Sequence, residues 1–220
     1  MIGGMSIEAL QKLFGFMLEA SGITLKLFAM TLIYGLPLGM IVCLGRMSKL
    51  WIIREPVKIY LLVMRGTPLI LQLFFWCYGP YYIFGDRLEI FDAAVLAFAL
   101  NYAAYFAEIF RGGIESIPVG QREAATVLGF TKTQTFFKII LPQVIKRVLP
   151  PMSNEFMTLV KDTALANVIG VAEMYQLATK NMSSQASVMP LIMAGVFYLV
   201  MNMVVQKVFN VAEKKLSYYK

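Results

Sequence analysis

The stretch from residue 27 to residue 45 reads LFAMTLIYGLPLGMIVCLG, and no charged side chain interrupts it between Lys26 and Arg46. At a rise of about 1.5 Å per residue, a helix of this length nearly spans the ~30 Å hydrocarbon core of a bilayer. Three further apolar runs follow along the chain, at residues 66–85, 93–107 and 188–206. The sequence therefore predicts an all-α, polytopic membrane protein.

The composition supports this fold class and excludes several others. Of the 220 residues, 59% are hydrophobic and 15% are charged, whereas soluble domains are roughly 45–50% apolar and about 25% charged. The mean hydropathy is +0.67. Lys and Arg number 20 against 13 Asp and Glu, an excess that in a membrane protein marks cytoplasmic loops and not nucleic-acid binding.

Three absences in the sequence narrow the possible chemistry. The chain has no histidine, which excludes His-based triads and imidazole metal sites. Cys43 and Cys77 lie apart in apolar runs and are expected to be buried small side chains, so no metal site is predicted. The chain has no phosphate-binding G-x-x-x-x-G-K-[ST] motif, so no cofactor is expected here and any ATP must bind another chain.

The distribution of charges in the loops predicts the topology. Residues 46–58, 111–138 and 207–215 are basic, whereas residues 79–92 carry three acidic side chains and one arginine. Because cytoplasmic loops carry the excess of Lys and Arg, the basic segments are placed inside and the acidic loop outside. A last span that leads into a cytoplasmic tail must begin outside, so the chain must cross once more before it. Five spans result, with the N-terminus outside and the C-terminus in the cytoplasm.

The additional crossing is assigned to residues 136–160, which read FFKIILPQVIKRVLPPMSNEFMTLV. This segment contains three prolines and Glu155 and is too polar to face lipid, so it should be packed in protein or line a water-filled path. Broken helices of this kind form substrate sites in transporters. We expect it to line a translocation pathway. The alternative is a structural helix kinked at Pro150 and Pro151, with Glu155 paired internally.

The first 20 residues are predicted to form an amphipathic helix lying in the membrane interface. Leu10, Leu13 and Met17 recur at helical spacing, which gives one apolar face. Glu8 and Lys12 interrupt the apolar core that a cleavable signal peptide would need.

The most specific motif in the chain is Glu-Ala-Ala-x3-Gly-x9-Ile-x-Leu-Pro at residues 123–142. It predicts a short helix that ends at Gly129, followed by a turn and a helix that re-enters the membrane. Ala124 and Ala125 would leave a slim surface able to enter a groove on a partner, and Glu123 could pair with a partner's arginine. An ordinary surface helix is the alternative.

This motif resembles the signature of the permease subunits of ABC importers, and every fixed position of it is met. Residues 65–69 (RGTPL) with Gln72, residues 107–114 (AEIFRGGI) and residues 161–163 (KDT) resemble the polar amino-acid uptake branch of that family. The resemblance extends from about the first span to the tail, and the five predicted spans agree with the five or six of such subunits.

The resemblance implies a single permease domain over residues 1–220, with a cytoplasmic coupling helix within residues 118–131. It places in the ATPase-coupling surface Glu123, Ala124, Ala125, Gly129 and Phe130. It further implies a prokaryotic inner membrane location and no catalytic activity in this chain. A partner ABC ATPase binds ATP and Mg, a second permease chain (identical or a paralogue) completes the pathway, and an extracellular or periplasmic binding protein delivers a polar amino acid.

Candidate substrate contacts follow from the needs of an amino acid. Glu155 and Asp162 are seven residues apart, hence on one helical face, and could bind the ammonium group. Lys161 and Thr163 could bind the carboxylate, unless Lys161 and Asp162 are solvated at the external end of the span. Arg65 could line the path or extend to the cytoplasmic interface. The full candidate set is Glu155, Lys161, Asp162, Thr163, Asn101, Tyr102 and Arg65.

The main alternative function is an ion-gradient-driven secondary amino-acid transporter in which Glu155 relays protons. The motif at residues 123–142 would then have no role. Dependence of uptake on a partner ATPase separates the two. A non-transporting sensor or assembly protein would bind partners without moving a substrate.

Overall fold

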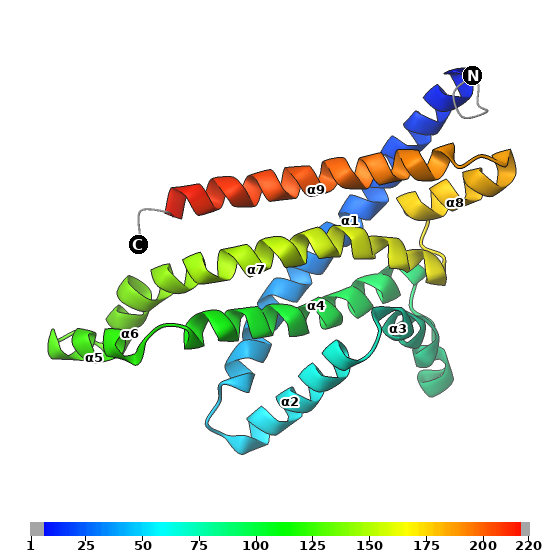
Figure 1. Ribbon diagram of the computed structural model, residues 1–220. Coiled ribbons are helices and arrows are strands. Elements are labelled where there is room, and N and C mark those ends of the chain that lie inside the picture. The colour runs from blue at the N-terminus through cyan, green and yellow to red at the C-terminus, as the bar shows by residue number, and fades with distance from the viewer. Residues whose placement is uncertain (1–6, 217–220) are drawn as a thin grey trace.

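The computed structural model describes residues 7–216, which form helices connected by short turns, with no strand in this part of the chain (Figure 1). A π-helical segment, Phe136–Ile140, precedes α7, and a 3-10 segment, Thr163–Ile169, follows it. The α-helices are α1 (Ile7–Arg46), α2 (Trp51–Gly66), α3 (Leu69–Phe84), α4 (Ile90–Glu115), α5 (Val119–Val127), α6 (Lys132–Thr135), α7 (Leu141–Asp162), α8 (Met174–Gln185) and α9 (Met189–Leu216).

The sequence predicted a separate interfacial helix over residues 1–20, whereas residues 7–20 form the first part of the continuous helix α1. Residues 1–6 lie outside the described residues. No proline interrupts α1 before Pro37, and the hydroxyls of Ser21 and Thr24 donate to the Leu18 and Ala20 carbonyls of the same helix. The apolar stripe of this region packs against α8 and α9.

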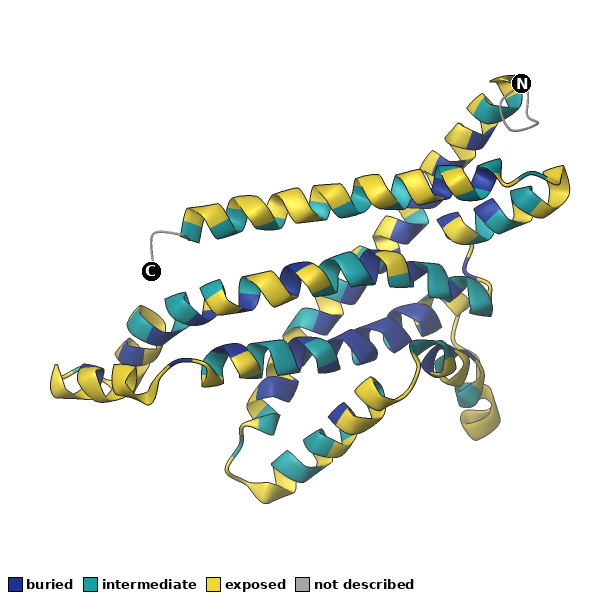
Figure 2. Cartoon of the chain, in the orientation of Figure 1, coloured by how far each residue is buried: buried dark blue, intermediate teal, exposed yellow. Residues whose placement is uncertain are grey.

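Helix α4 lies at the centre of the fold and packs along α1. Figure 2 shows buried residues concentrated along α4. The two backbones approach closely at Gly35 and Gly39, which have the small-xxx-small spacing that lets membrane helices pack tightly. A Cβ atom at Gly39 would lie 2.8 Å from the Cβ of Phe106 and 3.0 Å from the carbonyl oxygen of Ala103. Glycine at this position is therefore required by the contact between α1 and α4.

The second predicted span, residues 66–85, corresponds to the single helix α3, and a sharp bend separates α3 from the preceding helix α2. Helices α2 and α3 meet at a bend of 109° around Thr67 and Pro68. The bend has a local cause, because proline disfavours helical geometry in the residue before it and cannot donate a backbone hydrogen bond. Only α3 occupies the uncharged run, and the two helices together form a broken span or a re-entrant loop.

The predicted break of the fourth crossing at its prolines is also wrong, because α7 continues through Pro150 and Pro151. Adjacent prolines lose two backbone hydrogen bonds but keep φ near the helical value. The contacts of α7 with α4 and α9 hold the helix along this part of its length. The irregular geometry lies at the two ends of α7, in the π-helical and 3-10 segments.

By length and apolar character, α1, α4 and α9 can each cross a membrane, and the bent pair α2–α3 makes a fourth candidate. The predicted runs at residues 93–107 and 188–206 are thereby confirmed as long helices. Helix α7 does not meet the same criterion of length and apolar character, because charged residues interrupt its apolar sequence. In Figure 1, one side of the view holds helices α5 and α6, the α1–α2 turn and the C-terminal end of α9. The other side holds helices α3 and α8 and the N-terminal end of α1.

Candidate functional site

A cavity of about 600 Å³ lies between the α2–α3 bend, α4 and α7, and we call it the bend cavity. It brings together side chains from three separate parts of the sequence. Five of the seven predicted substrate contacts line it, namely Arg65, Asn101, Tyr102, Glu155 and Asp162. Thr158, one turn from Glu155 and Asp162, also lines the cavity and was not predicted.

Glu155 and Asp162 share one face of α7, as their spacing predicted, and both open onto the bend cavity. The hydroxyl of Tyr102, a buried residue of α4, donates to Oδ2 of Asp162 over 2.7 Å. Within residues 7–216, the Glu155 carboxylate forms neither a hydrogen bond nor a salt bridge. Asp162 is thus held in place by α4, while Glu155 presents an unpaired carboxylate to the cavity.

Asn101 supports the wall of the cavity. Its Nδ2 donates to the Met64 carbonyl over 2.9 Å and to Oε1 of Gln72 over 3.0 Å. Nε2 of Gln72 in turn donates to the carbonyl of Met64 (3.0 Å) and to Oγ1 of Thr67 (2.9 Å). These bonds satisfy backbone groups freed by the bend, so the amide donor of Asn101 is already occupied. The sequence analysis placed Gln72 only within the family resemblance. A lone amide in an apolar run could have indicated its role in binding the backbone at the bend.

Two predicted contacts do not line the bend cavity. Lys161 is exposed at the end of α7. Thr163 is completely buried, and its hydroxyl donates to the Val160 carbonyl over 2.7 Å. Residues adjacent to Asp162 in sequence are rotated by roughly 100° around the helix, which explains why neither reaches the cavity.

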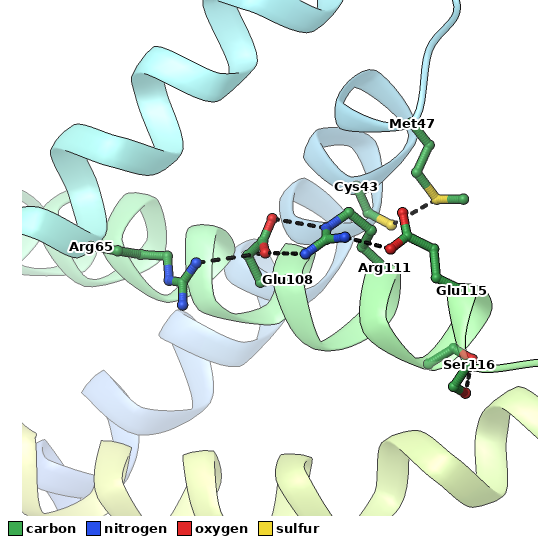
Figure 3. Close-up of polar contacts among 8 residues, drawn as sticks. Cys43, Met47, Arg65, Glu108, Arg111, Glu115 and Ser116 are labelled. Carbon is green, nitrogen blue, oxygen red and sulfur yellow. Dashed lines mark hydrogen bonds and ion pairs between the residues drawn. The ribbon is translucent and has the colours of Figure 1, made fainter.

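Arg65 stands between the bend cavity and a second cavity of about 430 Å³, which Arg46 and Lys58 also line. Its Nη1 lies 3.6 Å from Oε2 of Glu108, and its guanidinium carbon lies 5.5 Å from the centre of the Tyr105 ring. Glu108 also pairs with Arg111 on the next turn of α4, at 2.7 Å (Figure 3).

The predicted short helix of the motif corresponds to α5 and ends where expected. Gly129 has a φ of +76°, the left-handed conformation that favours glycine. Glu123 and Ala124 are exposed, whereas Ala125 is buried within this chain and is not available to a partner. The sequence did not indicate that Val127 and Leu128, two of the variable positions inside the motif, are 87% and 73% exposed.

Comparison with known proteins identifies the family. The sequence profile of the family described as "Binding-protein-dependent transport system inner membrane component" matches residues 35–218. This chain belongs to that family. The resemblance to ABC importer permeases, based on residues 123–142, is thereby confirmed, and a secondary transporter is not favoured.

Similar proteins cover almost the whole of this inner membrane component. The L-cystine transport system permease protein TcyB of Bacillus subtilis (strain 168) is 38% identical over 200 residues, covering 89% of this chain and 84% of the relative. The arginine transport system permease protein ArtQ of the same organism is 37% identical over 207 residues, covering 92% and 93%. The octopine transport system permease protein OccM of Rhizobium radiobacter is 36% identical over 206 residues, covering 88% and 83%.

Solved structures agree with this assignment. A chain of an amino acid ABC transporter crystallised with histidines has a TM-score of 0.86 and 33% sequence identity, covering 96% of this inner membrane component and 99% of that chain. A chain of the inward-facing MetNI methionine ABC transporter has a TM-score of 0.73 at 18% identity, over the same shares of the two chains. At that identity, the second likeness shows the fold alone.

Proposed function

We propose that this permease forms the alternating-access pathway of an ATP-driven importer of polar amino acids. The observation that carries the proposal is the bend cavity, where Glu155 and Asp162 of α7 and Arg65 of the α2–α3 bend line one space. The names of the relatives, which refer to cystine, arginine and octopine transport, support an amino acid or a derivative of one as the substrate.

The charges of the bend cavity suit a zwitterion. An α-ammonium group would lie against Glu155, whose carboxylate has no partner within residues 7–216, and against Asp162, which Tyr102 orients. The α-carboxylate would lie against Arg65, because a guanidinium group binds carboxylates well. With two carboxylates and one guanidinium in the wall, the cavity also suits a substrate with a cationic side chain.

The proposed topology has five crossings, formed by α1, the bent pair α2–α3, α4, α7 and α9, within one permease domain. The N-terminus lies outside and the C-terminus in the cytoplasm of a prokaryotic cell, since the basic segments cluster at one end of the helices. Helix α7 crosses despite its charges because it packs against α4 and α9 and lines the bend cavity.

The exposed surface of α5 is the proposed coupling site for a partner ABC ATPase, which binds ATP and Mg. Glu123, Ala124, Val127 and Leu128 are exposed there, and an exposed apolar pair beside a carboxylate suits a protein groove. Closure of the ATPase pair would move α5 and shift the permease between two states that substrate also biases. A second permease chain and an external binding protein complete the assembly. The chain itself performs no catalysis and binds no nucleic acid.

The proposal is tested with the permease, its ATPase and its binding protein reconstituted in proteoliposomes and supplied with a panel of amino acids. We expect ATPase turnover and uptake to rise with one substrate class. Glu155→Gln should abolish uptake while the complex still assembles, and Lys161→Gln, whose side chain lies outside the cavity, should transport normally. Uptake by the permease alone under an ion gradient would overturn the proposal, as would normal uptake by Glu155→Gln.

A further inference from the structure

A third cavity, larger than the two described above, lies outside the proposed pathway, between α5 and the adjoining ends of α1, α4 and α7. Its volume is about 900 Å³, within the range of roughly 300–1,000 Å³ typical of ligand pockets. We call it the α5 groove. Its interior is apolar, with walls formed by Met40, Leu44, Phe110, Ile114, Ile140 and Val144.

The charged residues of the α5 groove have one sign. Arg122 of α5 and Lys132 of α6 line it, and none of its lining residues is acidic. Within the described part of the chain, neither cation takes part in a salt bridge. The hydroxyls of two lining threonines are engaged by the backbone, because Thr126 donates to the Arg122 carbonyl and Thr135 to the Thr131 carbonyl. The charge that the groove offers to a ligand is therefore cationic.

The groove lies where two candidate membrane-spanning helices end. Helix α1 ends at Arg46 and α4 at Glu115 (Figure 1). The groove is lined by the last turns of both and by the segment that connects α4 to α7. In the proposed topology this end of the helices is cytoplasmic, so an apolar space that opens there beside cations lies near the lipid headgroups. Basic pockets between helices at this level bind anionic headgroups.

The geometry of the wall suits a flexible apolar chain. Met40 and Met47 line the α1 side, and methionine adapts to irregular apolar ligands. The opposite wall includes Phe136 and Ile140 of the π-helical segment. Such segments are rare and are frequent at functional sites.

We propose that the α5 groove binds an anionic phospholipid, with an acyl chain against the apolar wall and the phosphate against Arg122 and Lys132. The occupant is a lipid because the groove combines an interior apolar enough for an acyl chain with two cations and no carboxylate. A bound lipid would contact α5 and the ends of α1, α4 and α7 together, so it would set the position of α5 relative to the membrane helices.

The test measures lipid retention on the permease purified with its ATPase. Native mass spectrometry would count bound phosphatidylglycerol and, separately, phosphatidylcholine with the same acyl chains. Wild type should retain phosphatidylglycerol preferentially. The double variant Arg122→Gln/Lys132→Gln should bind it about 30-fold more weakly, as expected for the loss of two cations at a membrane surface. Lys49→Gln/Lys138→Gln, two exposed lysines that do not line the groove, should bind it as wild type does.

A second pair of variants tests the apolar wall. Leu44 lines the groove and is 61% exposed, whereas Ile41, one turn earlier on α1, is 65% exposed and lies outside the lining. Leu44→Trp should fill the groove and release the lipid, and Ile41→Trp should retain it. The conservative variant Arg122→Lys/Lys132→Arg, which keeps both charges, should also retain it and shows that the fold tolerates changes at these positions.

Three results would overturn the proposal. One is equal retention of both lipids by wild type, and another is unchanged phosphatidylglycerol binding in both groove variants. The third is protection of Leu44→Cys from a water-soluble thiol reagent by the ATPase in the absence of lipid, because the groove would then belong to a protein partner.

Discussion

The Arg65 guanidinium lies 3.6 Å from the Glu108 carboxylate and so joins the end of α2 to α4. Glu108 also binds Arg111, which in turn binds Glu115 at the end of α4 (Figure 3). Four charges of alternating sign thus connect the bend cavity with the loop that precedes α5. This network extends from the wall of the proposed substrate site to the last turn of α4.

The contribution of this ion pair to stability should be small. The Arg65 side chain is 43% exposed, and a double-mutant cycle with Arg65→Gln and Glu108→Gln should give a coupling free energy of about 0.2–1 kcal/mol. Glu108→Gln alone should destabilise more than Arg65→Gln, since it also removes a partner of Arg111. Denaturant unfolding in detergent measures all four corners of the cycle. A coupling free energy above about 2 kcal/mol would show that the pair is better shielded from solvent than its exposure indicates.

The hydrogen bond from Tyr102 to Asp162 should contribute more to stability than the ion pair between Arg65 and Glu108 does. Tyr102→Phe removes the donor from a half-buried carboxylate and should lower the free energy of unfolding by about 1–3 kcal/mol. Tyr105→Phe is the matched control, because its hydroxyl donates no hydrogen bond within the part of the chain that the structure describes. Equal effects of the two substitutions on thermal unfolding would argue against a structural role for the Tyr102 hydroxyl.

The close approach of α1 and α4 predicts opposite effects for two glycines of one helix. Gly39→Ala would place a Cβ atom 2.8 Å from the Cβ of Phe106, and forcing the helices apart should cost about 1–3 kcal/mol. Gly22→Ala meets no atom within 4 Å and should stabilise by up to about 1 kcal/mol through helix propensity. The melting temperatures of both variants in one detergent provide the measurement, and a stabilised Gly39→Ala protein would contradict the packing described.

Much of the fold could be predicted because apolar run length and loop charge are local properties. The helices containing residues 27–45, 93–107 and 188–206 follow from them directly. The bend at Pro68 was missed because hydropathy ignores proline geometry in an otherwise apolar run. The predicted break at Pro150 was wrong for the opposite reason, since packing against α4 and α9 keeps α7 continuous. Local proline geometry decided the first case, and tertiary contacts decided the second.

The candidate site was predicted where helical spacing carries the information. Glu155 and Asp162 share a face because seven residues are two helical turns, and both line the bend cavity. Lys161 and Thr163 were chosen for adjacency in sequence, which does not imply adjacency in space. The role of Asn101 depended on the bend at Thr67, so no sequence pattern alone could have separated support of the wall from contact with a substrate.

The last prediction concerns α5. Glu123 is exposed on this helix, so Glu123→Lys should leave the fold intact while it reverses the charge presented to the ATPase. We expect substrate-stimulated ATPase turnover and uptake to fall by at least about tenfold. This corresponds to the loss of a charge pair that contributes about 1.4 kcal/mol or more to the interaction with the ATPase. The turnover and uptake of Glu123→Gln should lie between those of Glu123→Lys and wild type. Thr133→Lys, which adds a charge at an exposed position of α6, should couple normally. Unimpaired ATP-driven uptake by Glu123→Lys would remove Glu123 from the coupling surface, because a lysine cannot replace a carboxylate as the partner of an arginine.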